Sequence, residues 1–315
     1  MALTIGVDVG GTKVAAGVVD DRGRILEKVR RPTPSTDPIQ TAEVIAEVVD
    51  LLKGKFEDVE AVGLGAAGFV DEARSTVLFA PNLAWREEPI KEKVEGLAGL
   101  PVVVENDANA TAWGEFRFGA GRGERFLVLV ALGTGIGGGI IVDGRLYRGR
   151  FGLGGEIGHF RMVPDGRRCG CGNRGCWEQY ASGNALVHEA RELARVAPAM
   201  AGRLLELGEG SPEGISGPEI TQAAREGDNA ALECFRTVAG WAGQGLADLA
   251  AILDPGAFII GGGLSEAGDL LLEPVRDAFE AAVTGRGHRR LPDIRIAELG
   301  PDAGIVGAAD LARSR

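Results

Sequence analysis

The sequence predicts an α/β protein of two domains, and three observations lead to this prediction. Apolar strands and an amphipathic helix alternate in the first part of the chain, a Gly-Thr hairpin occurs twice, and the chain has 315 residues. A domain commonly holds ~100–200 residues, so this length suggests two of them. With 45% hydrophobic residues, the chain has ample material for a buried core.

The first strand begins at about Leu3 and enters the first hairpin. Residues 5–24 read IGVDVGGTKVAAGVVDDRGR, and residues 129–145 read LVALGTGIGGGIIVDGR. Each segment has an apolar strand, a Gly-Thr pair, a glycine five residues after that threonine, a second apolar run and an Asp/Gly turn. The matching residues are Gly11, Thr12 and Gly17 in the first segment and Gly133, Thr134 and Gly139 in the second.

The second hairpin also matches the dinucleotide fingerprint G-x-G-x-x-G at Gly133, Gly135 and Gly138. That fingerprint needs a helix after it, whose N-terminus meets the pyrophosphate, but here a strand and turn follow. The context therefore argues against a Rossmann site, and no P-loop motif occurs in the chain. Two glycine-rich tips remain, and their backbone N–H groups and threonine hydroxyls suit phosphate, although glycines in tight turns would explain either tip alone.

Residues 36–54 predict an amphipathic helix with Asp37 as its cap and Pro38 early in it. Buried strands are expected at 59–65 and 102–104. The second of these runs directly into Glu105-Asn106-Asp107, and a helix is expected to start at Ala108 or Asn109.

Ligands gather at the carboxyl ends of strands in open α/β sheets, which is where this polar triplet falls. Asp and Asn are also favoured helix caps, so one of the three residues could do only that. Three adjacent polar side chains exceed what one cap requires. An aspartate here can accept a proton from a substrate hydroxyl.

Three of the four cysteines lie in one short stretch, residues 158–180, together with His159. Thiols stay reduced in the cytoplasm, where we expect this protein, so the set favours a metal over disulfides. Three thiolates from Cys169, Cys171 and Cys176 and one imidazole satisfy tetrahedral Zn²⁺ with no open position, as in a structural zinc site. The alternative is a set of reduced, buried thiols with a solvated histidine. Cys234 lies in an apolar helical stretch and is expected in the core.

Two glutamates stand close to this cluster in the sequence. Glu156 precedes His159 by three residues, and Glu178 follows Cys176 by two. A zinc-bound histidine donates its other ring N–H to an oxygen, and two carboxylates beside it would accept hydroxyl hydrogen bonds. Such a row of groups suits a sugar or polyol, whereas either glutamate alone would by default face solvent.

A third glycine cluster, residues 261–263, ends the apolar run 257–260. It permits close backbone approach to a nucleotide, or it makes an ordinary turn before a helix capped by Ser265. Helices are expected along 185–206 and 229–253, and a closing helix in the last stretch, 300–315.

Charge and hydropathy exclude two classes of partner. The net charge of −11 argues against nucleic acid, whose phosphates demand a basic surface. The longest apolar runs are too rich in glycine for membrane helices, and the N-terminal stretch reaches Asp8 without a basic, apolar targeting segment.

Five motifs resemble the ROK family (repressors, open reading frames and sugar kinases), and the overall resemblance is to its bacterial glucokinases. They are VDVGGTK at 7–13, ENDANA at 105–110, LGTGIGGGI at 132–140, GEIGH at 155–159 and CGCGNRGCWE at 169–178. The resemblance implies an actin-like (ribonuclease H-like) ATPase fold with an interdomain cleft. It places a small domain at 1–108, completed by about 300–315, and a large domain with the zinc loop at 109–299.

The resemblance also implies roles for individual residues. Asp107 would be the catalytic base on the sugar 6-hydroxyl, with ATP as phosphoryl donor, and Asp8 would lie near the phosphate-bound Mg²⁺. The sugar would be held by Asn106, Asp107, Glu156, His159 and Glu178. The structural zinc would be held by His159, Cys169, Cys171 and Cys176. The nucleotide would be surrounded by Gly11, Thr12, Lys13, Thr134, Gly135, Gly262 and Gly263.

Several alternatives stay open on the sequence. Relatives act on mannose, fructose, allose, N-acetylglucosamine or N-acetylmannosamine, and polyphosphate could replace ATP. A homodimer or homotetramer is what the resemblance suggests. A sugar-sensing repressor would carry a helix-turn-helix before the first hairpin, so DNA binding is not expected. The interpretation as a nicotinamide-dependent oxidoreductase relies on the dinucleotide fingerprint that the context argues against. The interpretation as a zinc-organised interaction module leaves the two Gly-Thr tips unexplained.

Overall fold

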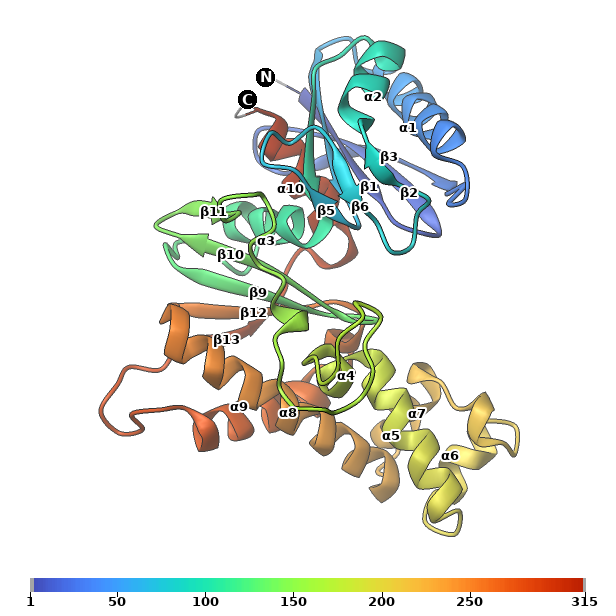
Figure 1. Ribbon diagram of the computed structural model, residues 1–315, viewed down its shortest axis with the longest axis vertical. Coiled ribbons are helices and arrows are strands. Elements are labelled where there is room, and N and C mark those ends of the chain that lie inside the picture. The colour runs from blue at the N-terminus through green and yellow to red at the C-terminus, as the bar shows by residue number, and fades with distance from the viewer. Residues whose placement is uncertain (1–2, 314–315) are drawn as a thin grey trace. The chain divides into compact units, whose positions relative to one another are not determined.

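The computed structural model describes residues 3–313, and in them the strands form two five-stranded sheets and one small three-stranded sheet (Figure 1). The strand orders are β3-β2-β1-β4-β8, β11-β10-β9-β12-β13 and β5-β6-β7. The strands of the first sheet are β1 (Leu3–Val9), β2 (Lys13–Val19), β3 (Ile25–Pro32), β4 (Val59–Ala66) and β8 (Val102–Asn106). Those of the second are β9 (Leu127–Leu132), β10 (Ile136–Val142), β11 (Arg145–Tyr147), β12 (Ala257–Gly261) and β13 (Asp293–Ile296). The small sheet holds β5 (Phe69–Val70), β6 (Val77–Phe79) and β7 (Arg86–Glu88).

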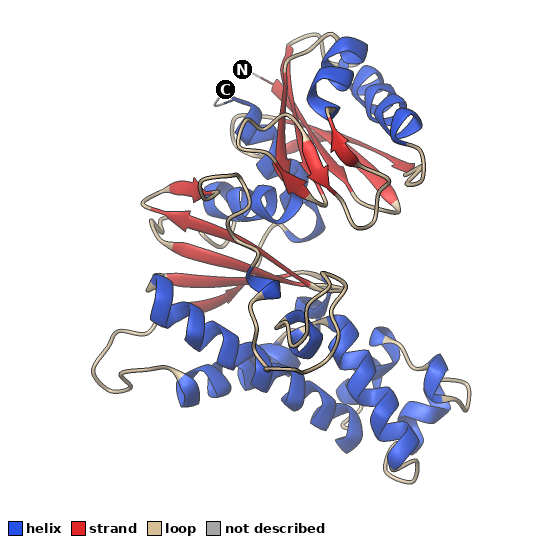
Figure 2. Ribbon diagram, viewed as in Figure 1, coloured by secondary structure: helices blue, strands red, loops and turns tan. Residues whose placement is uncertain are grey.

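The helices follow the expected alternation in the first part of the chain and predominate later (Figure 2). They are α1 (Pro38–Lys53), α2 (Ile90–Ala98), α3 (Asp107–Phe118), α4 (Glu178–Ala181), α5 (Gly183–Val196), α6 (Gly202–Leu207), α7 (Gly217–Arg225), α8 (Asn229–Leu253), α9 (Asp269–Ala282) and α10 (Ala303–Arg313). Short 3₁₀ helices are η1 (Ile157–His159), η2 (Pro212–Gly214), η3 (Gly263–Ala267) and η4 (Gly300–Asp302).

The first sheet confirms the first hairpin and the α/β alternation. β1 pairs antiparallel with β2, from Thr4 opposite Val19 to Val9 opposite Val14, and parallel with β4. Helix α1 covers one face, and Ile45 of α1 packs in one core with Val7 of β1. The Asp37 carboxylate accepts hydrogen bonds from the backbone N–H groups of residues 39 and 40, so the predicted cap is confirmed.

Helix α10 covers the other face of this sheet. A side-chain carbon at Gly6 of β1 would stand 1.8 Å from the carbonyl oxygen of Ile305, and one at Gly63 of β4 equally close to that of Ala308. Only glycine permits such backbone contact between a helix and a sheet. The predicted closing helix is therefore confirmed, and α10 is part of the core of the first sheet.

The second Gly-Thr hairpin is β9 and β10, neighbours in the second sheet. A strand follows its glycines, as the argument against a dinucleotide fingerprint required. Gly139, the glycine five residues after Thr134, lies under α3: a side-chain carbon there would stand 2.3 Å from the Ala112 Cβ. A side-chain carbon at Gly17 in the first hairpin would likewise stand 3.2 Å from the Cγ2 of Ile305 in α10, closer than an ordinary van der Waals contact. The repeated glycine thus serves helix packing in both hairpins.

Three predicted helix boundaries were wrong. Helix α3 begins at Asp107, because the Asn106 side chain caps it by accepting from the Asn109 N–H at 3.0 Å. Ser265 caps no α-helix; its hydroxyl donates to the Gly262 carbonyl inside η3, and α9 starts only after Gly268. The apolar stripe 185–206 is interrupted after Val196, since Pro198 cannot continue a helix.

The chain groups by its own contacts into two compact units. Unit 1 holds the residues through Leu129, Gly138–Gly155 and the residues from Ala297 on, and unit 2 holds Val130–Gly137 and Glu156–Ile296. The division predicted from the sequence, 1–108 with about 300–315 against 109–299, stays a prediction. Among the described residues, none of the helices combines the length and apolar character needed to cross a bilayer.

Glu115 of α3 ties the returning chain to unit 1. Its buried carboxylate accepts hydrogen bonds from the backbone N–H groups of Ala120 (2.9 Å), Glu298 (3.0 Å) and Leu299 (2.7 Å). A hydrogen bond to a charged group contributes about 1.5–3 kcal/mol, and Glu115→Ala removes three at once. We expect its free energy of unfolding in urea to fall by at least about 3 kcal/mol. Glu43→Ala, at an exposed position of α1, should stay within about 0.5 kcal/mol of wild type. Equal stability of the two variants would contradict this role of Glu115.

Candidate active site

The sequence-predicted site residues fall into two sets, one in each unit. The set in unit 1 is Asp8, Gly11, Thr12, Lys13, Asn106 and Asp107. The set in unit 2 is Thr134, Gly135, Glu156, His159, Cys169, Cys171, Cys176, Glu178, Gly262 and Gly263. Each set is described within its own unit.

The four predicted zinc ligands lie together in unit 2. His159 ends η1, and the three cysteines lie on the loop before α4. One ligand atom from each of these residues lies within 4.8 Å of the others. The Cys169 Sγ is 3.6 Å from His159 Nδ1, and the Cys171 Sγ is 3.6 Å from the Cys176 Sγ.

These separations fit a tetrahedral zinc ion. Zn–S bonds are ~2.3 Å and Zn–N bonds ~2.0–2.1 Å, so adjacent ligand atoms of a tetrahedron lie roughly 3.5–3.8 Å apart. All four cysteines of the chain are free thiols, as expected, and Cys234 is buried in α8 as predicted. Because Nδ1 of His159 faces the thiols, its Nε2 is the ring nitrogen left to donate to another group.

The loop that carries the cysteines is held by backbone bonds and by a buried tryptophan. The Cys169 N–H donates to the Asn173 carbonyl at 2.9 Å, and the Met162 N–H to the Gly175 carbonyl at 2.8 Å. Trp177, fully buried, donates its indole N–H to the Trp241 carbonyl of α8 at 2.8 Å. The loop is therefore anchored to the longest helix of unit 2 among the described residues.

The thiols do not titrate alike. Burial raises the pKa of Cys169 and Cys176. Burial acts on Cys171 in the same direction, but hydrogen bonds from the Asn173 backbone and from neighbouring thiols outweigh it and lower its pKa. Binding a metal to this set therefore releases protons, because only thiolates are ligands.

Glu178, the first residue of α4, lies at the edge of the cluster. Its Oε1 accepts from the Cys169 thiol at 2.9 Å and is 3.7 Å from His159 Nδ1. A side-chain carbon at Gly135 would stand 2.3 Å from Glu178 Oε2, so the second Gly-Thr tip reaches the same place. Burial raises the pKa of Glu156, an effect that His159 partly opposes.

A cavity of about 970 Å³ opens beside this tip within unit 2. Thr134 and Gly263, both predicted from sequence, line it. Gly135 and Gly262 are not among the lining residues; Gly262 has φ +81° and lies against the backbone of Leu132. The cavity wall also includes residues that the sequence analysis missed, from α5, from α7 and the residue after it, and from η3: Asn184, Gly217, Thr221, Arg225, Glu226 and Glu266.

Two signals could have found part of this wall. Ser182 caps α5 by accepting a hydrogen bond from the Ala185 N–H, and Asn184 lies in the first turn of that helix. Ser216 and Glu219 form a capping box at the start of α7, a pattern readable as S-x-x-E. Helix N-termini that meet a glycine-rich tip suit an anionic ligand.

In unit 1 the polar triplet lies where β8 becomes α3. Asn106 donates its amide to the Gly68 carbonyl at 3.1 Å, and its oxygen caps α3. Asp107 is half-buried in the first turn, and its Oδ1 accepts from the Ala108 N–H at 2.9 Å. The helix N-terminus favours the ionised carboxylate that a base requires.

The first Gly-Thr tip joins β1 to β2. Thr12 is exposed in this tip. The Gly10 N–H donates to the Lys13 carbonyl at 3.0 Å and so closes the turn. Burial raises the pKa of Asp8 at the end of β1, and the charge of Lys13 partly lowers it. A carboxylate beside a backbone tip can serve a phosphate-bound Mg²⁺, and a lysine there can pair with the phosphate itself.

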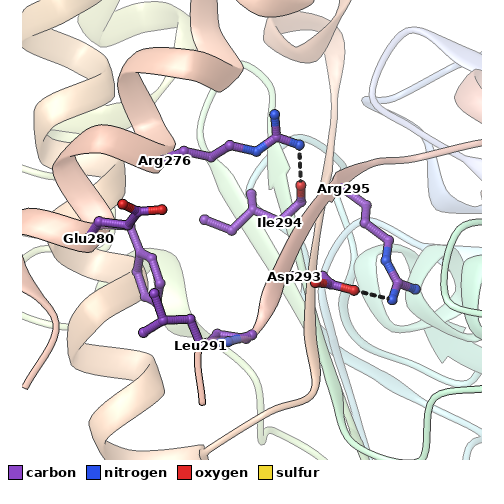
Figure 3. Close-up of a pocket in the computed structure, with 8 residues that line it drawn as sticks. Arg276, Glu280, Leu291, Asp293, Ile294 and Arg295 are labelled. Carbon is purple, nitrogen blue, oxygen red and sulfur yellow. Dashed lines mark hydrogen bonds and ion pairs between the residues drawn. The ribbon is translucent and has the colours of Figure 1, made fainter. Parts of the chain in front are cut away.

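A further cavity, of about 390 Å³, lies between α9 and β13 (Figure 3). Arg276 donates to the Ile294 carbonyl at 2.8 Å, and Arg295 pairs with Asp293 at 2.6 Å. Its wall contains no residue of the predicted site.

The chain is similar to known proteins over its whole length. The family model described as "ROK family" matches residues 4–315. A glucokinase of Streptomyces coelicolor is 56% identical over 313 residues, which cover 99% of this chain and 98% of that protein. A glucokinase of Thermotoga maritima is 38% identical over 318 residues, covering 99% and 97%.

Among solved structures, a ROK family glucokinase from Streptomyces griseus in complex with glucose and AMPPNP superimposes with a TM-score of 0.91, at 56% identity and 100% coverage of both chains. The resemblance inferred from the five motifs and the predicted fold class are thereby confirmed. This chain belongs to the ROK family and has its actin-like ATPase fold.

Proposed function

We propose that this chain is a glucokinase that transfers the γ-phosphoryl group of ATP to the 6-hydroxyl of D-glucose. The strongest support is full-length similarity to glucokinases, at 56% identity to one from Streptomyces coelicolor. A similarly close chain was solved with glucose and an ATP analogue. The two Gly-Thr tips and the polar ends of the strands supply the groups that this reaction needs.

Asp107 is assigned as the general base. Phosphoryl transfer asks for in-line positioning of the hydroxyl and for charge stabilisation, with little covalent chemistry from the protein. The base accepts the 6-hydroxyl proton as the oxygen attacks the γ-phosphorus, and ADP leaves. A carboxylate in the first turn of a helix, where the helix dipole favours negative charge, suits this role.

The remaining sugar hydroxyls are assigned to Asn106, Glu156, His159 and Glu178. A zinc held by His159 Nδ1 and the three cysteines would fix the orientation of the imidazole, leaving Nε2–H to donate to the sugar. The zinc would have no open position and would therefore brace the site without contacting the reacting atoms.

The nucleotide is assigned to the two glycine tips and the large cavity of unit 2. Thr134 and Gly135 of the second tip and Gly11, Thr12 and Lys13 of the first supply donors for phosphate oxygens. Gly262 and Gly263 flank the nucleotide, and Asp8 stands near the Mg²⁺ that neutralises the phosphate charge when bound. We expect a homodimer or homotetramer to carry out this reaction.

A panel of sugars tests the substrate. ADP formation would be measured with ATP and, separately, glucose, mannose, fructose, allose, N-acetylglucosamine and N-acetylmannosamine, and the glucose reaction repeated with polyphosphate. The proposal predicts the highest kcat/KM for glucose with ATP. Preference for another sugar, or for polyphosphate, would replace that part of the proposal and keep the family.

A further inference from the structure

Glu105, directly before the proposed sugar and base residues, is a buried carboxylate with two arginine partners. Its side chain is 1% exposed. Its Oε2 lies 2.9 Å from Arg148 Nε and 3.1 Å from Arg74 Nε. All three residues belong to unit 1, and together they are called the Glu105 cluster.

The other oxygen of Glu105 holds the start of α3. Oε1 accepts from the Asn106 N–H at 3.0 Å and from the Asn109 side-chain amide at 3.1 Å. Asp107 lies between these two residues. The carboxylate therefore fixes both sides of the turn that carries the proposed base.

Arg148 connects the first turn of α3, through Glu105, to the turn between β5 and β6 and to the loop that Arg148 itself begins. Its guanidinium donates to the Asp71 carbonyl at 2.8 Å and to the Glu72 carbonyl at 3.1 Å, in the turn between β5 and β6. Arg148 also begins the loop 148–155, which runs directly into Glu156. The turn between β5 and β6 is also fixed to β8, because the Val104 N–H donates to the Arg74 carbonyl at 3.1 Å.

Stability alone gives a poor reason for such a cluster. Replacing a buried ion pair by apolar groups of similar size is often neutral or stabilising, whereas removing one partner is costly. A directional ionic arrangement does fix one geometry, and a small misplacement of a catalytic group can lower a rate roughly 100-fold.

We propose that Glu105 and Arg148 are positioning residues for phosphoryl transfer, because their contacts hold the first turn of α3 and with it the Asp107 carboxylate. This inference rests on the proposed function. Neither residue is assigned a contact with sugar or nucleotide.

The chain offers a closely matched control in Asp310 of α10. Its buried carboxylate also has two arginine partners, Arg117 at 3.1 Å and Arg313 at 3.1 Å, and accepts from the Trp113 indole N–H at 2.8 Å. These contacts lie in the second half of α3 and the last turn of α10 and not on the first turn of α3.

The test compares Glu105→Gln, Arg148→Met, Arg148→Lys and Asp310→Asn. For each variant, kcat, the KM for ATP, urea unfolding and amide hydrogen exchange of the first turn of α3 would be measured. We expect kcat to fall roughly 10–100-fold in Glu105→Gln and Arg148→Met with the KM for ATP unchanged. Arg148→Lys should recover part of kcat, since it keeps the charge. Amide hydrogen exchange in the first turn of α3 should accelerate in Glu105→Gln and Arg148→Met, and less in Arg148→Lys.

Asp310→Asn separates positioning from stability. It should lose as much stability as Glu105→Gln yet keep kcat within about twofold of wild type. A Glu105→Gln chain with near-normal kcat, or a loss of kcat that is equal in Asp310→Asn, would overturn the inference. Unchanged first-turn exchange in Glu105→Gln would overturn it independently of any activity. Absence of sugar turnover in the wild-type chain would instead contradict the proposed function.

Discussion

Asp107→Asn is expected to bind glucose with nearly normal affinity and to lose almost all turnover. The amide keeps the size and the hydrogen-bonding reach of the carboxylate, but it cannot accept the proton of the 6-hydroxyl. General base catalysis contributes roughly 10²–10⁴-fold, so kcat should fall by that factor. Turnover would be followed by ADP release and glucose affinity by calorimetry.

Asp37→Asn is the matched control for this variant. Asp37 also stands at the start of a helix in unit 1, and asparagine is an equally good cap, so this variant should keep normal kcat and stability. If Asp107→Asn retained near-normal kcat, Asp107 would not be the base. If it lost glucose binding as well as turnover, the variant would report on the sugar site and not on proton transfer.

Cys171→Ser is expected to abolish binding of the proposed zinc and to weaken the proposed binding of glucose. Cys171 is the exposed member of the cluster, so the substitution disturbs packing least. A closed structural site does not tolerate loss of a ligand, and zinc content should fall from about one ion per chain to near zero. His159 would then lose its fixed orientation, and the KM for glucose should rise about tenfold, the equivalent of one lost hydrogen bond of about 1.5 kcal/mol.

Cys234→Ala is the control, because Cys234 is buried in α8 away from the cluster. It should keep the zinc and the KM for glucose, whatever stability it loses. Zinc would be measured by mass spectrometry on chains purified without added metal. A Cys171→Ser chain that keeps its zinc would refute the ligand set. Loss of the zinc without any change in the KM for glucose would refute the bracing role.

The sequence predicted the parts of the fold that local patterns determine. Apolar runs predicted β1, β4 and β8, and Asp37 followed by Pro38 predicted the start of α1. The cysteines and His159 were identified as one site because all of them lie within 18 residues of one another. Metal ligands close in sequence need only one loop to meet.

Features that depend on distant residues were beyond such patterns. Arg148 pairs with Glu105 across 43 residues of chain, and no spacing rule connects them. The glycine five residues after each threonine was visible as a repeat, but its purpose depends on α3 and α10, which pack there from elsewhere in the chain. The start of α3 was misplaced by one or two residues because several polar side chains competed for one cap.

The most direct test of the central claim is formation of glucose 6-phosphate from glucose and ATP by the purified chain with Mg²⁺. The product would be detected by coupling to a glucose-6-phosphate dehydrogenase, whose specificity reports the position of the new phosphate. The account predicts NADPH formation that requires both ATP and glucose and is lost in Asp107→Asn. ADP release without a glucose 6-phosphate signal, or no reaction at all, would contradict it.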